Sequence, residues 1–208
     1  MKKVRIVMLS LLILCISLIG IINCGAGSGK EEGGDETGSG DIDSVAEKFA
    51  ITSSAFSDGG KIPLKYSCGA ESNYKKPSLP LSWSGVPAGT KSFVLLFDDL
   101  HEVADGWVHW LVIDIPATAK SLAEGAGGKS MPSGAKELKN SWGESGYGGP
   151  CPPPPTGKHT YRLQLFAMPD AETSLSFDGR NGRQISEMLK SNALGIATIT
   201  GTYDRSAK

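Results

Sequence analysis

Two short apolar runs, separated by a segment rich in acid and histidine, constrain this chain most. Residues 92–97 and 111–115 are dominated by Phe, Val, Leu and Ile. Each run is too short for a typical helix and rich in residues that favour strands, so each predicts a buried strand. The segment between them, residues 98–110, then joins two strand ends. Because a sheet holds such loops in fixed positions, this segment is the first candidate for a functional site.

The histidines fall in this segment and in one other. The 208-residue chain has three: His101 and His109 lie in the first segment, and His159 lies in a second one, residues 146–161, which is rich in glycine and proline. A polar side chain at a strand end often does no more than complete a local hydrogen bond. The placement of every histidine beside turns and carboxylates favours one shared site instead.

Side-chain alternation predicts how the main strands are buried. Residues 107–115 put His109, Leu111 and Ile113 on one face and Trp110 on the other. Both faces are apolar, so this strand is expected to be central in its sheet. Residues 159–168 alternate apolar and polar side chains, which predicts a half-buried strand.

Helical periodicity is clear in residues 182–191, where Ile185, Met188 and Leu189 form one stripe. One helical turn is also expected near residues 121–124. Pro80 favours an edge position for the extended segment around it. Further extended segments are expected at residues 50–56, 62–66, 79–83 and 193–203. Many short strands and little helix predict a mainly β, sandwich-like fold with a few short helices.

The first 24 residues have the layout of an export signal. Basic residues precede an almost unbroken apolar run at residues 6–22. This run is at the short limit for a membrane-spanning helix, roughly 17–25 residues, and fits a signal peptide better. Cys24 follows directly and resembles the lipobox cysteine of bacterial lipoproteins, whose sulfur receives a diacylglyceryl group. Ile21 and Asn23 depart from the usual pattern, so plain secretion and an uncleaved anchor remain alternatives.

The rest of the chain divides into a tether and one domain. Residues 25–46 are mostly glycine, serine and acid, which predicts a flexible tether. Residues 47–208 are long enough for a single domain. The net charge of −1 implies no basic face for nucleic acid. Cys68 and Cys151 either pair in an oxidising compartment or remain two free thiols.

Several motifs in order resemble the phosphatidylethanolamine-binding protein family, in its bacterial Raf-kinase-inhibitor-like branch. The motifs are Asp99 in the acidic loop, Trp-Val-His-Trp at 107–110, Gly-Gly-Pro-Cys-Pro-Pro at 148–153, His-Thr-Tyr at 159–161, the segment 80–90, and Thr-Gly-Thr-Tyr at 200–203. The chain departs from the family pattern at residues 100–103, where Leu-His-Glu-Val replaces Pro-Asp-Ala-Pro. The resemblance implies a Greek-key β-sandwich with a small anion pocket.

By the same resemblance, the pocket would take a phosphate-like anion or a phospholipid head group. Its residues would be Asp99, His109, Pro153, His159 and Tyr161. The two imidazoles, the tyrosine hydroxyl and the N–H groups of the glycine-rich loop would donate to the anion. Asp99 would fix the tautomer of a histidine and raise that histidine's pKa.

Three functions remain in competition. The preferred one is an exported, lipid-anchored, non-catalytic binding module on the periplasmic or cell-surface side of a bacterial membrane. The second is a hydrolase or other acid–base enzyme that uses Asp99, His109 and His159. The third is regulation by contact with a protein such as a kinase or protease, of which the sequence names none. The histidine spacing matches no zinc signature, so no metal or cofactor is expected.

Overall fold

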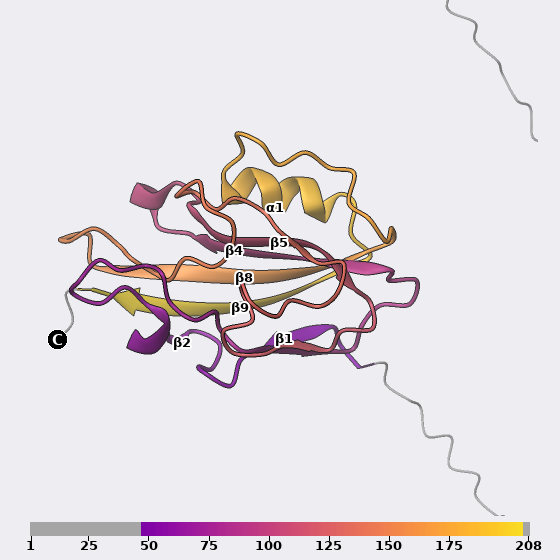
Figure 1. Cartoon of the computed structure of the whole chain (residues 1–208), viewed down its shortest axis with the longest axis horizontal. Coiled ribbons are helices and arrows are strands. Elements are labelled where there is room, and N and C mark those ends of the chain that lie inside the picture. The colour runs from indigo at the N-terminus through magenta and orange to yellow at the C-terminus, as the bar shows by residue number, and fades with distance from the viewer. Residues whose placement is uncertain (1–46, 206–208) are drawn as a thin grey trace, which may run out of the picture. The chain divides into compact units, whose positions relative to one another are not determined.

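The computed structural model describes residues 47–205, and these form two β-sheets and one α-helix (Figure 1). The predicted export signal at 1–24, the lipidation site Cys24 and the tether at 25–46 lie outside the described residues. Between residues 47 and 205, no helix is long and apolar enough to cross a membrane.

The larger sheet has six strands in the order β2-β9-β8-β4-β5-β7. Its strands are β2 (Gly60–Lys61), β4 (Ser92–Asp99), β5 (Val108–Pro116), β7 (Lys136–Glu137), β8 (Lys158–Met168) and β9 (Gly195–Asp204). The pairing is antiparallel except between β2 and β9. Strand β4 pairs with β8 from Ser92 opposite Met168 to Asp99 opposite Tyr161. With this register, the end of β4, the start of β5 and the start of β8 lie together at one end of the sheet.

The smaller sheet contains β1 (Ala50–Thr52), β3 (Leu81–Ser84) and β6 (Ser121–Leu122), in the order β1-β3-β6. It covers one face of the larger sheet, and the main hydrophobic core lies between the two. Trp83 of β3 packs there against Phe93 of β4, with ring centroids 5.5 Å apart. Every residue of β4 is buried, because both faces of this strand are covered. The predicted mainly β, sandwich-like fold is confirmed.

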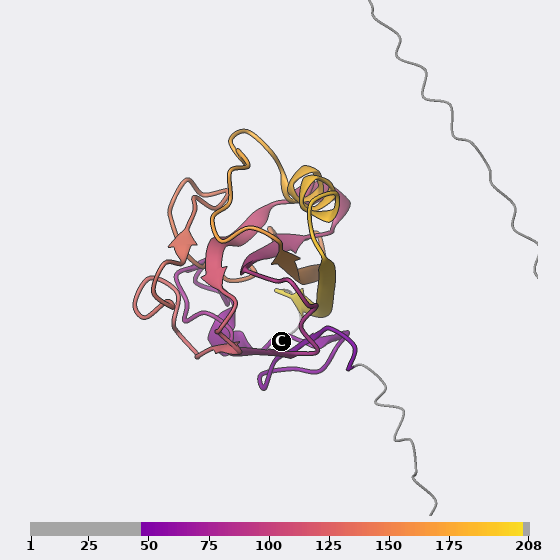
Figure 2. The same cartoon turned by 90° about the vertical axis from the view of Figure 1, so that its right-hand side faces the viewer.

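Helix α1 (Gly182–Lys190) lies on the opposite face of the larger sheet, as Figures 1 and 2 show from two directions. It begins with a capping box: the Asn181 side chain accepts from the Gln184 N–H at 3.0 Å, and the Gln184 side chain accepts from the Asn181 N–H at 3.1 Å. Ile185 and Leu189 point into a second core. The helix predicted at 182–191 is confirmed.

Two short segments differ from the sequence prediction. Residues 64–66 form the 3₁₀ turn η1 (Leu64–Tyr66) rather than an extended segment, because Pro63 starts a turn whose carbonyl accepts from the Tyr66 N–H at 3.0 Å. The helical turn expected near residues 121–124 is wrong as well. Strand β6 occupies Ser121–Leu122, and pairing with Leu81 buries Leu122 in the core.

The edge position expected for residues 79–83 is also wrong, because β3 is the middle strand of its sheet. Pro80 precedes the first residue of β3, so its missing N–H removes no bond from the ladder.

Strand β5 is central, as predicted, but its side chains do not alternate regularly. Phe97 pairs with Trp110 and Asp98 pairs with Val108, so His109 is an extra residue in a bulge. Trp110 points into the core between the sheets, whereas Val108 and Leu111 point toward α1. The prediction that His109 shares a face with Leu111 is therefore wrong.

Strand β8 is more deeply buried than the predicted half-buried strand. Residues Leu163 to Met168 are all buried. Helix α1 covers the face that the alternation pattern leaves polar, and the Ser186 hydroxyl donates to the Gln164 side-chain oxygen at 2.7 Å. The buried Gln164 side chain therefore has a hydrogen-bond partner inside a second core. Side-chain periodicity alone does not reveal that α1 buries this face of β8.

Candidate ligand-binding site

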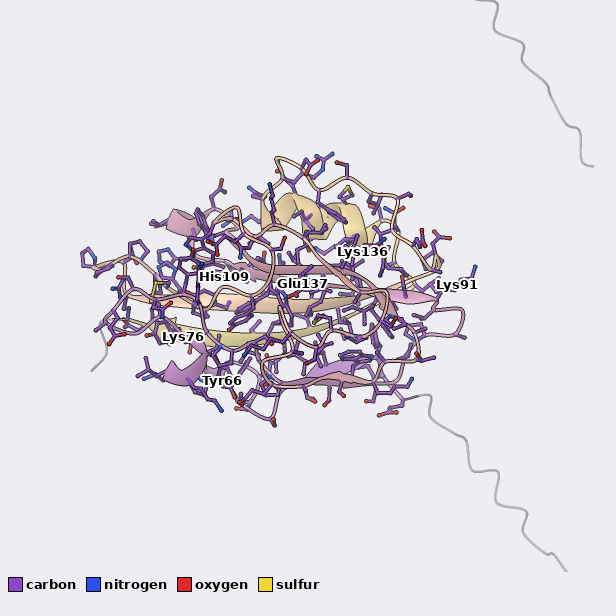
Figure 3. All side chains as sticks on the ribbon, viewed as in Figure 1. Tyr66, Lys76, Lys91, His109, Lys136 and Glu137 are labelled. Atoms are coloured by element: carbon purple, nitrogen blue, oxygen red, sulfur yellow. A yellow bond between two sulfur atoms is a disulfide. The ribbon has the colours of Figure 1, made fainter. Side chains whose placement is uncertain are left out.

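A cavity of about 270 Å³ lies at the end of the larger sheet where the end of β4 and the starts of β5 and β8 meet. Four of the predicted site residues line it: Asp99 from the end of β4, His109 from the start of β5, His159 from the start of β8, and Pro153 from the proline-rich loop. Figure 3 marks the place of His109 in the fold. The remaining lining residues are Val103, Ala104, Trp107, Trp142, Cys151 and Pro152.

Asp99 and His159 form a buried pair. The Asp99 Oδ2 atom lies 2.6 Å from His159 Nδ1, and both side chains are almost fully buried. The other carboxylate oxygen, Oδ1, accepts the backbone N–H of His101 at 2.9 Å. Both Asp99 oxygens therefore have partners, and the carboxylate fixes Nδ1 of His159 as a hydrogen-bond donor.

The second ring nitrogen of His159 contacts Thr156. His159 Nε2 lies 2.8 Å from the Thr156 hydroxyl, which itself donates to the Pro153 carbonyl at 2.6 Å. A hydroxyl has one hydrogen to give, so in this arrangement the Thr156 oxygen accepts from Nε2. Both nitrogens of His159 are thus held by hydrogen-bond partners, Asp99 on one side and Thr156 on the other. The Thr156 hydrogen is committed to Pro153 and is not available to His159.

His109 has a different environment. Its Nδ1 atom lies 2.8 Å from the Gly148 carbonyl oxygen, and its own backbone carbonyl accepts the Gly148 N–H at 2.8 Å. Burial lowers the pKa of His109 to about 4, so the ring is neutral near pH 7 with its hydrogen on Nδ1. The expected link between Asp99 and a histidine therefore involves His159, and His109 has no N–H left to donate to an anion.

Tyr161 lies beneath the cavity and is not among its lining residues. Its ring is 5.2 Å from the His109 ring, and the side chain is fully buried. Its hydroxyl has no hydrogen-bond partner among the described residues. Burial, together with the nearby Asp99 carboxylate, raises the pKa of Tyr161 far above its usual value, so the hydroxyl stays protonated.

The glycine-rich loop supplies shape rather than donors. The Gly148 N–H donates to the His109 carbonyl and the Gly149 N–H to the Tyr74 carbonyl, each at 2.8 Å. A side chain at Gly148 would collide with the Trp142 ring, and one at Gly149 would collide with the Tyr66 backbone. The expectation that these two N–H groups bind an anion is therefore wrong.

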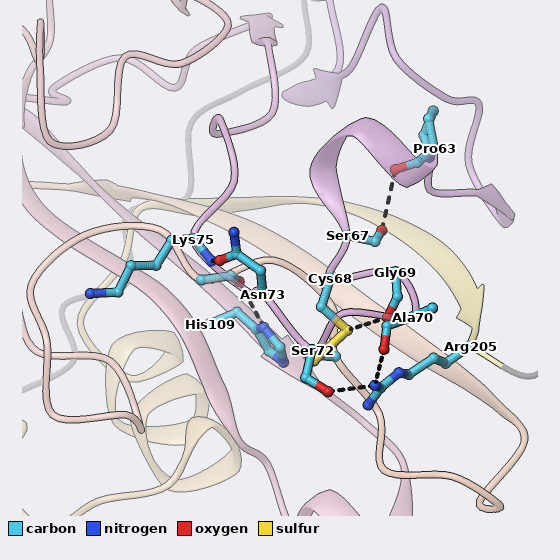
Figure 4. The surroundings of a disulfide bond; sticks show 12 residues. Pro63, Ser67, Cys68, Gly69, Ala70, Ser72, Asn73, Lys75, His109 and Arg205 are labelled. Carbon is cyan, nitrogen blue, oxygen red and sulfur yellow. Dashed lines mark hydrogen bonds between the residues drawn. A yellow bond between two sulfur atoms is a disulfide. The ribbon is translucent and has the colours of Figure 1, made fainter.

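A disulfide joins Cys68 to Cys151, with a Cα–Cα distance of 5.1 Å (Figure 4). The Cys68 N–H also donates to the Pro150 carbonyl at 2.9 Å. These two links hold the proline-rich loop, which forms one wall of the cavity, against the segment after η1. Since both sulfurs are bonded, Cys151 provides no thiolate for catalysis.

The rim of the cavity includes residues that the sequence did not single out as site residues. The 3₁₀ turn η2 (Glu102–Ala104) carries Val103, which is 59% exposed, and Trp107 beside it is 38% exposed. His101 precedes this turn, and its ring stacks on that of His159 with centroids 3.8 Å apart. The position of Trp107 two residues before the candidate His109, in the same motif, is a sequence signal that could have drawn attention to it.

A larger hollow of about 580 Å³ lies between the 137–145 segment and the residues just before α1. It contains none of the predicted site residues. No group of three or more His, Cys, Asp or Glu side chains within residues 47–205 could hold a metal ion. The smaller cavity is the better candidate because the buried Asp99–His159 pair lies there together with His109, whose pKa is lowered by burial.

Known proteins resemble this chain over most of the described residues. Residues 52–204 match the family model described as phosphatidylethanolamine-binding protein. The chain belongs to the phosphatidylethanolamine-binding protein family. It is 34% identical over 166 residues to the YbcL protein of Escherichia coli K12, a match that covers 76% of this chain and 89% of that relative.

Two further comparisons place the chain within this family. It is 36% identical over 160 residues to "Putative lipoprotein LppC" of Mycobacterium tuberculosis H37Rv, covering 77% of this chain and 74% of that protein. The crystal structure of E. coli YbcL, described as a member of the mammalian PEBP family, superposes with a TM-score of 0.65 at 33% identity. That superposition covers 76% of this chain and 98% of the YbcL chain.

Proposed function

We propose that this protein is an exported, lipid-anchored binding module that holds a small oxyanion or a phospholipid head group and catalyses no reaction. The observation that supports the proposal most is the cavity at the ends of β4, β5 and β8, which is lined by Asp99, His109, Pro153 and His159. Family membership supports a ligand of this class, because the family is described by its binding of a phospholipid.

We propose no catalysis because two groups near His159 that could act as nucleophiles, the Cys151 sulfur and the Thr156 hydroxyl, already have bonding partners. Cys151 is bonded to Cys68, and the Thr156 hydroxyl donates its hydrogen to the Pro153 carbonyl. A nucleophile needs a base that can accept its proton. Asp99 and His159 are therefore assigned to holding the cavity together and to ligand contact.

Anion binding is tested by thermal unfolding of the full chain, purified in a mild non-ionic detergent, with and without millimolar phosphate, phosphoethanolamine and acetate. A ligand that binds only the folded state raises the midpoint by mass action. We expect at least one of these compounds to raise the midpoint, and we expect His109→Ala to abolish that rise because it removes a wall of the cavity.

A matched control separates binding from stability. Gln164→Ala removes a buried polar side chain from the opposite face of β8, where it contacts Ser186. This variant should unfold at a lower temperature and keep the anion-induced rise. A midpoint that no anion changes in the wild type would remove the cavity as an anion site.

Anchoring is supported by the position of Cys24 directly after the apolar run and by the relative named as a lipoprotein. The Cys24→Ser variant should no longer incorporate a labelled fatty acid supplied to the producing cell, because the acylated sulfur is lost. Cys15→Ser, within the apolar run, is the matched control and should keep the label. Equal labelling of the two variants would contradict lipid anchoring at Cys24.

A further inference from the structure

The two cysteines of the disulfide differ in their exposure to solvent. Cys68 is 1% exposed. Cys151 is partly exposed, although Pro150 and Pro152 on either side of it are buried. It also lines the cavity of about 270 Å³ at the ends of β4, β5 and β8. A reagent in solvent therefore reaches this disulfide from the side of Cys151.

This difference in exposure decides how the disulfide reacts with a thiol. In thiol–disulfide exchange, a thiolate attacks one sulfur of the disulfide, and the other sulfur leaves as a thiolate. The sulfur that is attacked is selected by access and by the stability of the leaving thiolate. Because Cys68 is enclosed, we expect attack at Cys151 and departure of Cys68.

A positive charge near Cys68 favours the same direction of exchange. The Arg205 guanidinium donates to the Ala70 carbonyl at 3.0 Å and to the Ser72 hydroxyl (Figure 4). Both acceptors lie in the segment directly after Cys68, so this segment holds the cation. A positive charge near a cysteine stabilises its thiolate, which makes Cys68 the better leaving group.

Backbone hydrogen bonds hold the two cysteines together when the S–S bond is broken. The Cys68 N–H donates to the Pro150 carbonyl at 2.9 Å, and the Gly149 N–H donates to the Tyr74 carbonyl at 2.8 Å. Neither bond involves a sulfur atom, so neither depends on the disulfide. The released Cys68 thiol therefore stays close to Cys151 and can attack the new mixed disulfide, which expels the added thiol.

We infer that Cys151 is a site of reversible S-thiolation, at which a low-molecular-weight thiol becomes attached to the cysteine sulfur. The thiolate of the small thiol forms an S–S bond to Cys151, and the bond between Cys151 and Cys68 breaks. Cys68 takes up the proton that the small thiol has lost. The small thiol is oxidised to a disulfide and Cys68 is reduced, so the step needs no other oxidant or reductant.

The modification also acts on the candidate ligand site. Cys151 is one of the residues that line the cavity, so the added group is bonded to the cavity wall. We expect the modified protein to bind its ligand more weakly than the unmodified protein does. This second part of the inference rests on the proposed anion-binding function, whereas the modification of Cys151 itself does not.

Peptide mapping by mass spectrometry tests which sulfur is attacked. The full chain, in mild non-ionic detergent, is exposed briefly to millimolar 2-mercaptoethanol. An excess of N-ethylmaleimide in urea then stops the exchange and labels every free thiol. We expect 2-mercaptoethanol on Cys151 with maleimide on Cys68 to exceed the reverse arrangement by about 10-fold or more, because access selects the attacked sulfur.

The same reaction in urea is the matched control, because unfolding exposes both sulfurs. The two arrangements should then appear in similar amounts. Similar amounts in the folded chain, or an excess of the adduct on Cys68, would overturn the inference. So would a folded disulfide that stays intact under conditions in which the unfolded one reacts.

Two variants measure access without the exchange step. Cys68→Ala leaves the Cys151 thiol free, and Cys151→Ala leaves the Cys68 thiol free. On the peptide that carries each thiol, iodoacetamide should label Cys151 about 10-fold faster than Cys68 in the folded variants, and equally fast in urea. Equal rates in the folded variants would contradict access from the side of Cys151. If either variant does not fold, the mapping of the wild type still decides.

The effect on the cavity is tested with Cys68→Ala, which has no second thiol to expel the added group. Bis(2-hydroxyethyl) disulfide converts its Cys151 to the 2-mercaptoethanol adduct. The midpoint rise caused by the anion that stabilises the wild type should be smaller in the modified variant than in the unmodified one. An equal rise would refute control of the cavity and leave the modification site in place. A wild-type midpoint that no anion raises would instead remove the proposed function, while the mapping of Cys151 stands by itself.

Discussion

Asp98, next to the cavity residue Asp99, carries a buried charge whose cost depends on Arg162. Asp98 is fully buried, and Arg162 contacts both of its oxygens, at 3.0 and 2.7 Å. Burial raises the pKa of Asp98, and Arg162 acts against that rise. Arg162→Met leaves the carboxylate without its partner and should lower the free energy of unfolding by about 3 kcal/mol at pH 8. Urea unfolding measures the change.

The sign of the pH dependence follows from the same pair. Without Arg162, the pKa of Asp98 in the folded state rises further above its unfolded value, so the folded state binds a proton more strongly. The destabilisation by Arg162→Met should therefore shrink as the pH falls from 8 to 5. The double variant Asp98→Asn, Arg162→Met should remove this pH dependence. An equal loss at both pH values in the single variant would refute the account.

At the same scale, the sequence predicts which residues gather at the cavity better than it predicts their hydrogen bonds. The motif resemblance names Asp99, His109 and His159, and the structure brings these three to one cavity. The sequence does not reveal that Asp99 pairs with His159 or that His109 bonds to Gly148. These partners depend on the bulge at His109 and on strand register, both of which are set by contacts between residues far apart in the chain.

At the scale of elements, prediction succeeds where the signal is local. Helix α1 is readable because the capping pair Asn181 and Gln184 and the buried stripe lie within one segment. Strand β6 is not predictable from its own residues, because pairing with the distant β3 buries Leu122. Turn η1 is an exception, since it is not predicted although its hydrogen bond to the Pro63 carbonyl is local. The η2 turn borders the candidate site, since its Val103 and Ala104 line the cavity. This turn is capped by the His101 ring, which accepts a hydrogen bond from the Val103 N–H at 3.3 Å. Hydrophobic periodicity does not predict a cap of this kind.

For the whole molecule, the sandwich class follows from many short strands, but the strand order does not. The order β2-β9-β8-β4-β5-β7 brings β9, at the end of the chain, between β2 and β8. The order is set by pairing between strands that are far apart in the sequence. It is not predictable strand by strand, because each strand alone is compatible with many neighbours. The cavity exists because this order places the start of β8 next to the end of β4.

The disulfide acts at this same scale, because it links positions 83 residues apart in the sequence. Cross-linking a loop of that size limits the unfolded chain and stabilises the folded state by roughly 2–4 kcal/mol. The double variant Cys68→Ala, Cys151→Ala should therefore lose about that free energy of unfolding in urea. Full reduction of the wild type should produce a similar loss, while reductant should leave the double variant unchanged. A wild-type midpoint that survives complete reduction, verified by thiol alkylation, would mean that the Cys68 N–H bond to Pro150 and the packing of Gly149 on Tyr66 hold the cavity wall without the covalent link.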